Sequence, residues 1–259
     1  MIVPLTHQTV VITGAASGIG LAIAKAFLTA EADLIAIDRN EIALAELKAL
    51  APDRIETLCL NVAHFQDLQN ALEKRTIDHV VCSASVGSGK TGFPFWKLDP
   101  SDWTRVLDIS LMGIVNTLHA CVPSLLLGDT PKKSVLLLAS VAGQIGSQTD
   151  PPYSAAKAAT INFAQIAAKD FAPYGIRVNA ISPGMVKTDL NRAVYAASND
   201  SAHLSYEEWA AEKIKRVTPL GRWQDPEEFG TLAVFLASEA GRNITGQTIN
   251  LDGGQVMHS

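Results

Sequence analysis

The chain of 259 residues is poor in several residue types, and each shortage argues against a class of protein. Its three cysteines, Cys59, Cys82 and Cys121, form neither a Cys-x-x-Cys pair nor an even disulfide framework, which suits a reducing cytoplasm. Charged residues make up 18%, and the net charge of −5 comes without a basic block, so we expect neither nucleic acid nor an anionic membrane as partner. No apolar run approaches the roughly eighteen residues that span a bilayer. No secretory signal is evident at the N-terminus, and the six histidines lack ligand spacing, so we expect a cytoplasmic protein without a metal site.

Apolar residues are abundant, at 47% of the chain, and they fall in short runs that alternate with helical patterns. The runs predict strands at 9–13, 34–37, 58–60, 79–82, 135–139, 177–182 and 248–251. Helices are predicted at about 21–28, 41–50, 64–75, 102–127, 152–171 and 226–238. This alternation predicts a single α/β domain over residues 1–259, with a doubly wound, mostly parallel seven-stranded sheet and helices on both faces. Residues 185–223 break the alternation, and we expect a substrate lid there, or else an ordinary surface excursion.

A glycine-rich turn, Gly14-Ala-Ala-Ser-Gly18-Ile-Gly20, joins the first strand directly to the first helix. Glycines let the backbone approach a pyrophosphate, and the N-terminus of the helix supplies N–H donors. The pattern alone could be a tight turn. Between a strand and a helix it favours a phosphate cradle.

Asp38 ends the second strand, about 20 residues past the glycines, where an acid binds the ribose 2′-hydroxyl of NAD. A carboxylate there would also repel the 2′-phosphate of NADP. Arg39 complicates this interpretation, because a neighbouring arginine can accommodate that phosphate, and Asp38 could also cap the helix that starts after Asn40. Since the glycine turn holds no basic residue, we expect NAD rather than NADP.

Tyr153 and Lys157 are four residues apart near the start of a predicted helix, which places both side chains on one face. An ammonium group beside a phenol lowers the tyrosine pKa from its reference of about 10, so the pair predicts proton exchange with an alcohol or ketone. The same spacing is common on ordinary helix surfaces. The rest of this helix is apolar almost all round, which predicts a subunit interface on the side away from the sheet.

Together these motifs resemble the short-chain dehydrogenase/reductase family across nearly the whole chain. The motifs are Thr13-Gly14-x-x-x-Gly18-Ile19-Gly20, Asp38, Ser140 thirteen residues before Tyr153, Tyr153-x-x-x-Lys157, Pro183-Gly184, and Thr245-Gly246-Gln247 with Asp252-Gly253-Gly254. The resemblance implies a Rossmann fold in which Tyr153 is the general acid or base. Lys157 would lower its pKa and bind the nicotinamide ribose, and Ser140 would hydrogen-bond the substrate oxygen.

The resemblance also implies a set of cofactor contacts. They are Gly14, Ser17, Gly18, Ile19, Gly20, Asp38, Arg39, Asn61, Val62, Ala84, Tyr153, Lys157, Pro183, Gly184, Val186 and Thr188. We expect a homotetramer or homodimer through the helices at about 102–127 and 152–171.

Two positions depart from the family pattern. Cys82-Ser83-Ala84-Ser85 stands where the family usually reads Asn-Asn-Ala-Gly, and Ser85 is expected to crowd the cofactor slightly. Ser110 stands where the family usually has an Asn that helps seat a water in the proton relay from the lysine. Asn116 cannot replace it, because six residues along a helix is about 600°. Ser110 could hold that water through its hydroxyl or its backbone carbonyl, so it stays a catalytic candidate.

These features predict an NAD-dependent oxidoreductase that interconverts a secondary alcohol and a ketone, or a sugar lactol and lactone. Gln144, Ser147 and Asn191 in the expected substrate lining favour a small hydrophilic substrate such as a sugar, polyol or hydroxy acid, and Arg192 is a further candidate substrate residue. The alternatives are a 3-oxoacyl-type or other carbonyl reductase, and a non-catalytic NAD(P)-binding regulator on the same fold. Lys90, Lys97, Lys187 or Arg192 could read an anionic group on the substrate, or could simply be solvated cations.

Overall fold

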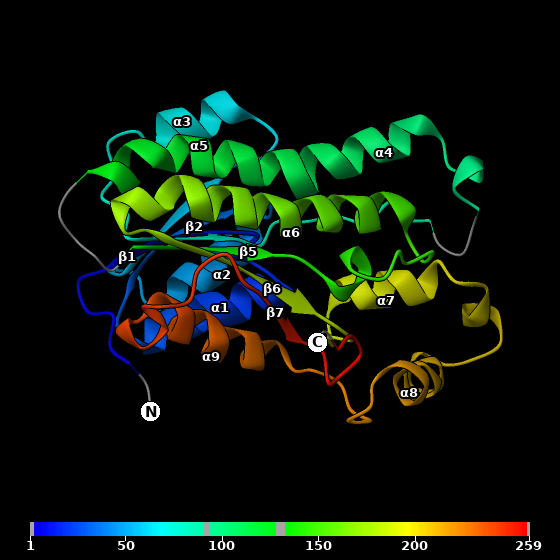
Figure 1. Ribbon diagram of the computed structural model, residues 1–259. Helices are drawn as coiled ribbons and strands as arrows, with labels where there is room; N and C mark the ends of the chain where they lie inside the picture. Colours follow the sequence, from blue (N-terminus) through cyan, green and yellow to red (C-terminus); the bar gives the residue numbers. More distant parts are fainter. Residues whose placement is uncertain (1–2, 91–93, 128–132, 258–259) are drawn as a thin grey trace.

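A computed structural model describes residues 3–90, 94–127 and 133–257, and its centre is one sheet of seven parallel strands (Figure 1). The strands are β1 (Thr9–Thr13), β2 (Asp33–Asp38), β3 (Ile55–Cys59), β4 (His79–Cys82), β5 (Ser134–Leu138), β6 (Arg177–Pro183) and β7 (Thr248–Leu251). They lie in the order β3-β2-β1-β4-β5-β6-β7. The chain therefore winds outward from β1 in one direction and from β4 in the other, which confirms the predicted doubly wound sheet.

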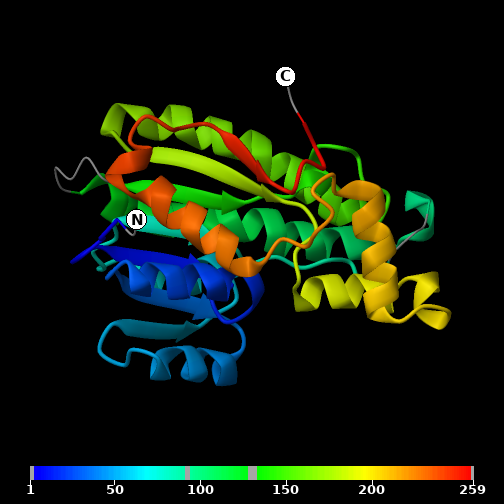
Figure 2. The same cartoon turned by 90° about the horizontal axis from the view of Figure 1, so that it is seen from below.

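Helices cover both faces of this sheet (Figures 1 and 2). One face carries α1 (Gly18–Thr29), α2 (Glu41–Ala49) and α9 (Pro226–Ala237), and the other carries α3 (Phe65–Leu72), α5 (Gly113–Leu126) and α6 (Pro151–Phe171). Phe27 and Phe229 are buried in the core of the first face, and Leu118 and Phe171 in that of the second. A parallel sheet needs this double cover, because its strands are apolar on both sides.

The predicted helix at 102–127 is longer than expected and is interrupted by a wider turn. α4 (Pro100–Leu107) starts with a capping box of Asp99 and Asp102, then passes through a π turn (Asp108–Met112) into α5. A π turn holds one residue more than an α turn, and the sequence pattern gave no sign of it.

The stretch Pro100–Leu126 is also the one helix in the described parts of the chain that is long and apolar enough to cross a membrane. The sequence holds no uninterrupted apolar run of that length, and this helix meets the criterion through its mean hydropathy. Leu118, Cys121 and Leu125 are nevertheless buried against the sheet, which is the packing of a core helix.

The segment between β6 and α9 lies beyond the carboxyl ends of the strands and has a small core of its own (Figure 1). It carries α7 (Asp189–Ala196), a 3₁₀ turn (Asn199–Ala202) and α8 (Tyr206–Val217). Tyr206 packs on Tyr195, Trp209 and Trp223, with ring centroids 5.5–6.0 Å apart. This aromatic cluster is separate from the two sheet cores, which suits the predicted lid.

Candidate active site

The glycine turn between β1 and α1 is so tightly packed that side chains would not fit at Gly14 and Gly20. Gly14 has φ +67°, and a Cβ there would lie 2.8 Å from the nitrogen of Ala84. A Cβ on Gly20 would lie 2.0 Å from the carbonyl oxygen of Gly14. Ser17 is the N-cap of α1, and its side chain makes no capping hydrogen bond. The turn thus brings bare backbone and a helix N-terminus together, the arrangement that binds phosphate.

Asp38 lies at the carboxyl end of β2, beside this turn. Its carboxylate accepts hydrogen bonds from the backbone nitrogens of Ala16 (3.1 Å), Arg39 (2.7 Å) and Asn40 (3.1 Å). Asn40, rather than Asp38, caps α2 through a bond from Ala43. A carboxylate offers about four lone-pair sites, so Asp38 keeps capacity for a ribose hydroxyl.

The loop after β3 is braced from α5. Asn116 donates from Nδ2 to the carbonyl oxygens of Val62 (3.0 Å) and Ala63 (3.3 Å). A Cβ on Gly113 would lie 2.5 Å from Cγ2 of Val62, so the helix must be bare there. Asn116 therefore positions the loop that carries Asn61 and Val62, and it does not take part in a relay at Lys157.

A cavity of about 510 Å³ runs along the carboxyl ends of the strands from Asp38 to Lys157. It is lined by every residue predicted to contact the cofactor, from the glycine turn, both sides of the sheet and the start of the lid. The glycine turn suits the phosphates of a dinucleotide, and the free lone pair of the Asp38 carboxylate suits a ribose hydroxyl. Leu190 and Asn191 of the predicted lid also line this cavity, as do Arg105 and Ile109, which the sequence did not indicate.

Ser140, Tyr153 and Lys157 meet at one end of the cavity. Ser140 follows β5 and caps the short turn η3 (Val141–Gly143), accepting a hydrogen bond from the nitrogen of Ala142 at 3.2 Å. Lys157 is 2% exposed, and its Nζ donates to the carbonyl oxygen of Leu138 at 2.5 Å. The same Nζ lies 5.4 Å from the centroid of the Tyr153 ring, so the predicted shared face is present.

The electrostatics of this group differ from the prediction. Burial raises the pKa of Tyr153 to about 12, although a hydrogen bond with Ser140 acts to lower it, and the charge of Asp150 adds to the rise. Burial lowers the pKa of Lys157 to about 7, against a smaller opposing effect of Cys82. The expectation that Lys157 lowers the tyrosine pKa is wrong, because desolvation of the phenol dominates and outweighs the hydrogen bond that acts in the opposite direction.

Ser110 is fully buried in the π turn, and its hydroxyl is already saturated. Oγ donates to the carbonyl oxygen of Val86 (3.2 Å) and accepts from the nitrogen of Val86 (3.0 Å) and from Oγ of Ser85 (2.9 Å). A serine hydroxyl has one proton and two lone pairs, so none is left for a water. The expectation that this hydroxyl could seat a relay water is therefore wrong, and of the two options only the backbone carbonyl remains.

A second cavity of about 220 Å³ adjoins the first at Ser140 and Tyr153. Its walls are largely apolar, and they consist mainly of Val141, Ala142, Ile145, Met185, Leu190, Ala193 and Val194, with Ser147, Thr149, Asp150 and Gln255 as polar members. Ser147 lies where it was predicted.

Two predicted substrate residues are placed elsewhere, which corrects the prediction. The amide of Gln144 is paired with that of Asn250 on β7 through two hydrogen bonds of 2.9 Å, and it does not line this cavity. Arg192 stacks on the ring of Tyr206, 4.4 Å from its centroid, outside both cavities. Lys97 and Lys187 are exposed and line neither cavity, whereas Lys90 lies at the rim of the second.

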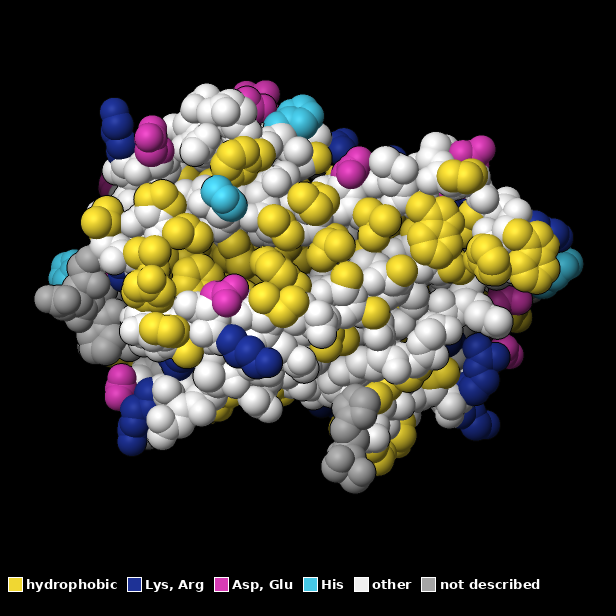
Figure 3. Space-filling view, turned by 45° about the horizontal axis from the view of Figure 1, so that its top comes forward, with side chains coloured by type: hydrophobic (Ala, Val, Ile, Leu, Met, Phe, Trp, Pro, Cys, Tyr) yellow, Lys and Arg dark blue, Asp and Glu magenta, His cyan; other side chains and the backbone are white. Residues whose placement is uncertain are grey.

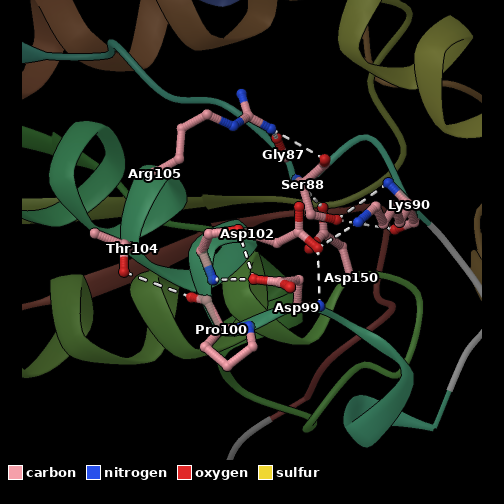
Figure 4. A network of polar contacts seen from close by, with 10 residues as sticks. Gly87, Ser88, Lys90, Asp99, Pro100, Asp102, Thr104, Arg105 and Asp150 are labelled. Atoms are coloured by element: carbon pink, nitrogen blue, oxygen red, sulfur yellow. Dashed lines mark hydrogen bonds and ion pairs between the residues drawn. The ribbon is translucent and has the colours of Figure 1, made fainter.

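The wall between β4 and α4 is held by residues that the sequence did not single out (Figure 4). Asp150, the N-cap of α6, accepts from the nitrogen of Ser88 (2.7 Å) and from that of Tyr153 (3.3 Å). Arg105 donates to the carbonyl oxygens of Gly87 (2.9 Å) and Ser88 (3.0 Å). An Asp before a Pro-Pro helix start is a recognisable capping signal, but nothing local pointed to Arg105. Residues 91–93 of the predicted loop lie outside the described residues.

Comparison with known proteins agrees with this geometry. The chain matches a family model described as enoyl-(acyl carrier protein) reductase over residues 14–256. It is 30% identical over 261 residues to a 3-oxoacyl-[acyl-carrier-protein] reductase of Thermotoga maritima, covering 98% of this chain and 99% of the relative. It is 28% identical over 257 residues to an NAD-dependent glycerol dehydrogenase of Listeria innocua, covering 98% and 95%.

Solved structures give the same result. A Brucella melitensis short-chain dehydrogenase/reductase described as a glucose/ribitol dehydrogenase is similar with a TM-score of 0.87 and 29% identity, covering all of both chains. A 3-oxoacyl-[acyl-carrier protein] reductase with bound NAD from the same organism has a TM-score of 0.84 and 31% identity, covering 99% of this chain and 94% of the other.

These relatives are enzymes, so the alternative of a non-catalytic regulator loses its support. The chain therefore belongs to the short-chain dehydrogenase/reductase family and is an oxidoreductase that acts on CH–OH groups.

Proposed function

We propose that this protein interconverts a secondary alcohol and a ketone, with Tyr153 as the residue that transfers the proton. One observation carries the proposal: Ser140 and Tyr153 line both the dinucleotide-sized cavity and the smaller cavity beside it. A cofactor in the first cavity and a substrate in the second would therefore meet at these two hydroxyl groups. The nicotinamide cofactor, when bound, supplies or accepts the hydride.

In the direction of reduction, the phenol of Tyr153 donates its proton to the carbonyl oxygen of the substrate. Its raised pKa keeps the phenol protonated near neutral pH, which is the form a proton donor needs. Ser140 holds the same oxygen and the phenol by hydrogen bonds, and this lowers the cost of the phenolate that forms. Lys157, whose Nζ is hydrogen-bonded to Leu138, would return a proton to the phenolate of Tyr153. Its pKa of about 7 allows it to give up that proton and to take up another near neutral pH.

For the cofactor we propose NAD. Asp38 stands at the ribose end of the cavity with free acceptor capacity, and its charge disfavours a 2′-phosphate. Arg39 is the group that could offset this effect, since it lines the same cavity. A related glycerol dehydrogenase is NAD-dependent, and a related reductase was solved with bound NAD.

The substrate has two candidates. The predicted small hydrophilic substrate retains Ser147, Thr149 and Gln255 as polar contacts, but Gln144 and Arg192 no longer support it. A 3-oxoacyl thioester gains support from the apolar walls of the cavity and from a groove of about 940 Å³ that continues outward from it past Ser147. Trp209, Lys213 and Arg216 line this groove, where an extended arm with a negative end could lie. Several relatives at 30–33% identity are 3-oxoacyl-[acyl-carrier-protein] reductases.

A parallel assay separates these candidates. Purified protein is given NADH or NADPH with a 3-oxoacyl thioester, and NAD or NADP with polyols and sugars, and absorbance at the nicotinamide band is followed. Tyr153→Phe should reduce turnover about 10²- to 10⁴-fold, the usual contribution of a general acid, with the dissociation constant of NADH nearly unchanged. Wild-type turnover in that variant would refute the proposed role of Tyr153.

The apolar surface of α4, α5 and α6 is the proposed interface of a homodimer or homotetramer. Figure 3 shows a band of hydrophobic side chains across this face. Large exposed apolar residues of these helices include Met112 (43% exposed), in the turn between α4 and α5, and Ile166 (48%), on α6. α6 is not apolar all round, because Asn162 and Gln165 are exposed on it. Ile166→Glu should shift the mass in light scattering toward the monomer, and an unchanged mass would contradict this interface.

A further inference from the structure

Ser85 and Ser110 are 25 positions apart in the chain, and their hydroxyls are hydrogen-bonded to each other at 2.9 Å. Ser110 is 0% exposed, and the same hydroxyl also holds both backbone groups of Val86. Ser85 and Val86 line the cavity that is proposed to bind the cofactor. One buried hydroxyl therefore fixes a stretch of backbone in the wall of that cavity.

Among the described residues, no other side chain is hydrogen-bonded to the backbone of Ser85 or Val86. The following stretch, Gly87 to Lys90, is held separately by Arg105, by Asp150 and by the ion pair of Lys90 with Asp102 (Figure 4). Those contacts border the substrate cavity. Loss of the Ser110 hydroxyl would thus loosen residues 85–86 and leave the rest of the wall attached.

Because Ser110 and Ser85 are in contact inside the protein, the side chain that fits at position 110 depends on the size of the side chain at position 85. Ser110 has no exposed surface, protein interiors contain few voids, and its Oγ lies 2.9 Å from Oγ of Ser85, so a larger side chain at position 110 would have to displace packed atoms, that Oγ among them. An asparagine at position 110 would add two heavy atoms there. A glycine at position 85 would remove two. The backbone at Ser85 does not require a glycine, because among described non-glycine residues only His7 and Glu31 have positive φ.

We propose that Ser85 and Ser110 form one positioning unit for the cofactor, and that the two residues can be exchanged for glycine and asparagine only together. The proposal rests on the proposed function insofar as the cavity binds a nicotinamide dinucleotide. The serines would then be paired changes: each departs from the family pattern, and each accommodates the other. Ser110 is a positioning residue and touches no reacting atom.

The test measures the dissociation constant of NADH by fluorescence titration, and the melting temperature, for Ser85→Gly, Ser110→Asn and the double variant. Ser110→Asn should weaken NADH binding about tenfold or more, the effect of disrupting buried hydrogen bonds and packing. The double variant should return to within about threefold of wild type, because neighbouring residues couple. Equal binding by wild type and Ser110→Asn, or a double variant no better than Ser110→Asn, would overturn the proposal.

Two further variants keep the test decisive if Ser110→Asn fails to fold. Ser110→Ala loses all three hydrogen bonds without adding volume and should weaken NADH binding, whereas Ser85→Ala loses only the bond between the two hydroxyls and should weaken it less. Ser124→Ala is the matched control, because Ser124 is a buried serine on α5 that accepts from Ile77 at 2.8 Å, away from the cavity. It should lower the melting temperature without changing NADH affinity. Wild-type NADH affinity in Ser110→Ala, or an equal loss in Ser85→Ala, would sink the inference. A wild-type protein that binds neither NADH nor NADPH would instead overturn the proposed function, and this inference with it.

Discussion

Lys157 should make the free energy of unfolding depend on pH in a way that can be calculated. Its side chain is 2% exposed, with one hydrogen bond to Leu138, and burial lowers its pKa to about 7 in the folded protein. The unfolded chain has the ordinary lysine value near 10.4. Between these two values the unfolded state binds more protons than the folded state, so stability rises with pH across this window.

Between pH 7 and pH 9.5 this single group should add about 3 kcal/mol to the free energy of unfolding, from a folded-state pKa of about 7. Lys157→Met removes the effect. It also removes the hydrogen bond to Leu138, a loss of about 1 kcal/mol that does not depend on pH in this range.

The assay is urea denaturation of wild type and Lys157→Met at pH 7 and pH 9.5 without cofactor. Comparing the pH dependence of the two proteins cancels all other titrating groups. Lys169→Met, on the exposed side of the same helix, is the control and should show the wild-type pH dependence. If Lys157→Met also kept it, the lysine would be charged inside the protein at pH 9.5 and the reasoning about its burial would be refuted.

Three further predictions concern other parts of the molecule. Gly143→Ala would place a Cβ 2.5 Å from backbone atoms of Lys157 and Ala158. The free energy of unfolding from urea denaturation should therefore fall by about 1–3 kcal/mol, and turnover should be slower. Unchanged stability would contradict this contact. Asp38→Ala should weaken NADH binding about 10- to 100-fold, the value of a charged hydrogen bond, and weaken NADPH binding less, so an equal loss for both would contradict the proposed preference. His79 has its pKa lowered to about 3, chiefly by burial and also by Arg177, so wild type should lose about 3 kcal/mol more than His79→Asn as the pH falls from 6.5 to 4; parallel stability curves would count against it.

Much of the fold and the cofactor site was predictable because their signals are local. Apolar runs of strand length, each followed by a helical pattern, indicated the strands and the parallel sheet. In such a sheet the ends of neighbouring strands meet at one edge, so Asp38, Asn61 and Ser140 had to lie near one another. Tyr153 and Lys157 are one helical turn apart, so their shared face followed from spacing alone.

What could not be predicted depends on side chains that meet from distant parts of the chain. Gln144 is polar and close to Ser140 in sequence. Its amide is nevertheless hydrogen-bonded to Asn250, 106 residues away, and does not line the substrate cavity. Ser88 finds its acceptor, Asp150, 62 residues later. The raised pKa of Tyr153 could not be predicted from its neighbours in the sequence either, because it arises mainly from burial, which depends on everything that packs around the phenol.

The π turn at Asp108–Met112 affects how the chain tolerates insertions and deletions. Each residue added to or removed from an α-helix rotates everything beyond it by about 100°. The turn stores one surplus residue, so a deletion within it would convert it to an ordinary α turn and leave α4 and α5 in phase. A deletion in α5 itself would turn Asn116 away from the loop at Val62. We therefore expect length variation among natural relatives to concentrate at this turn, with the two flanking helices fixed in length.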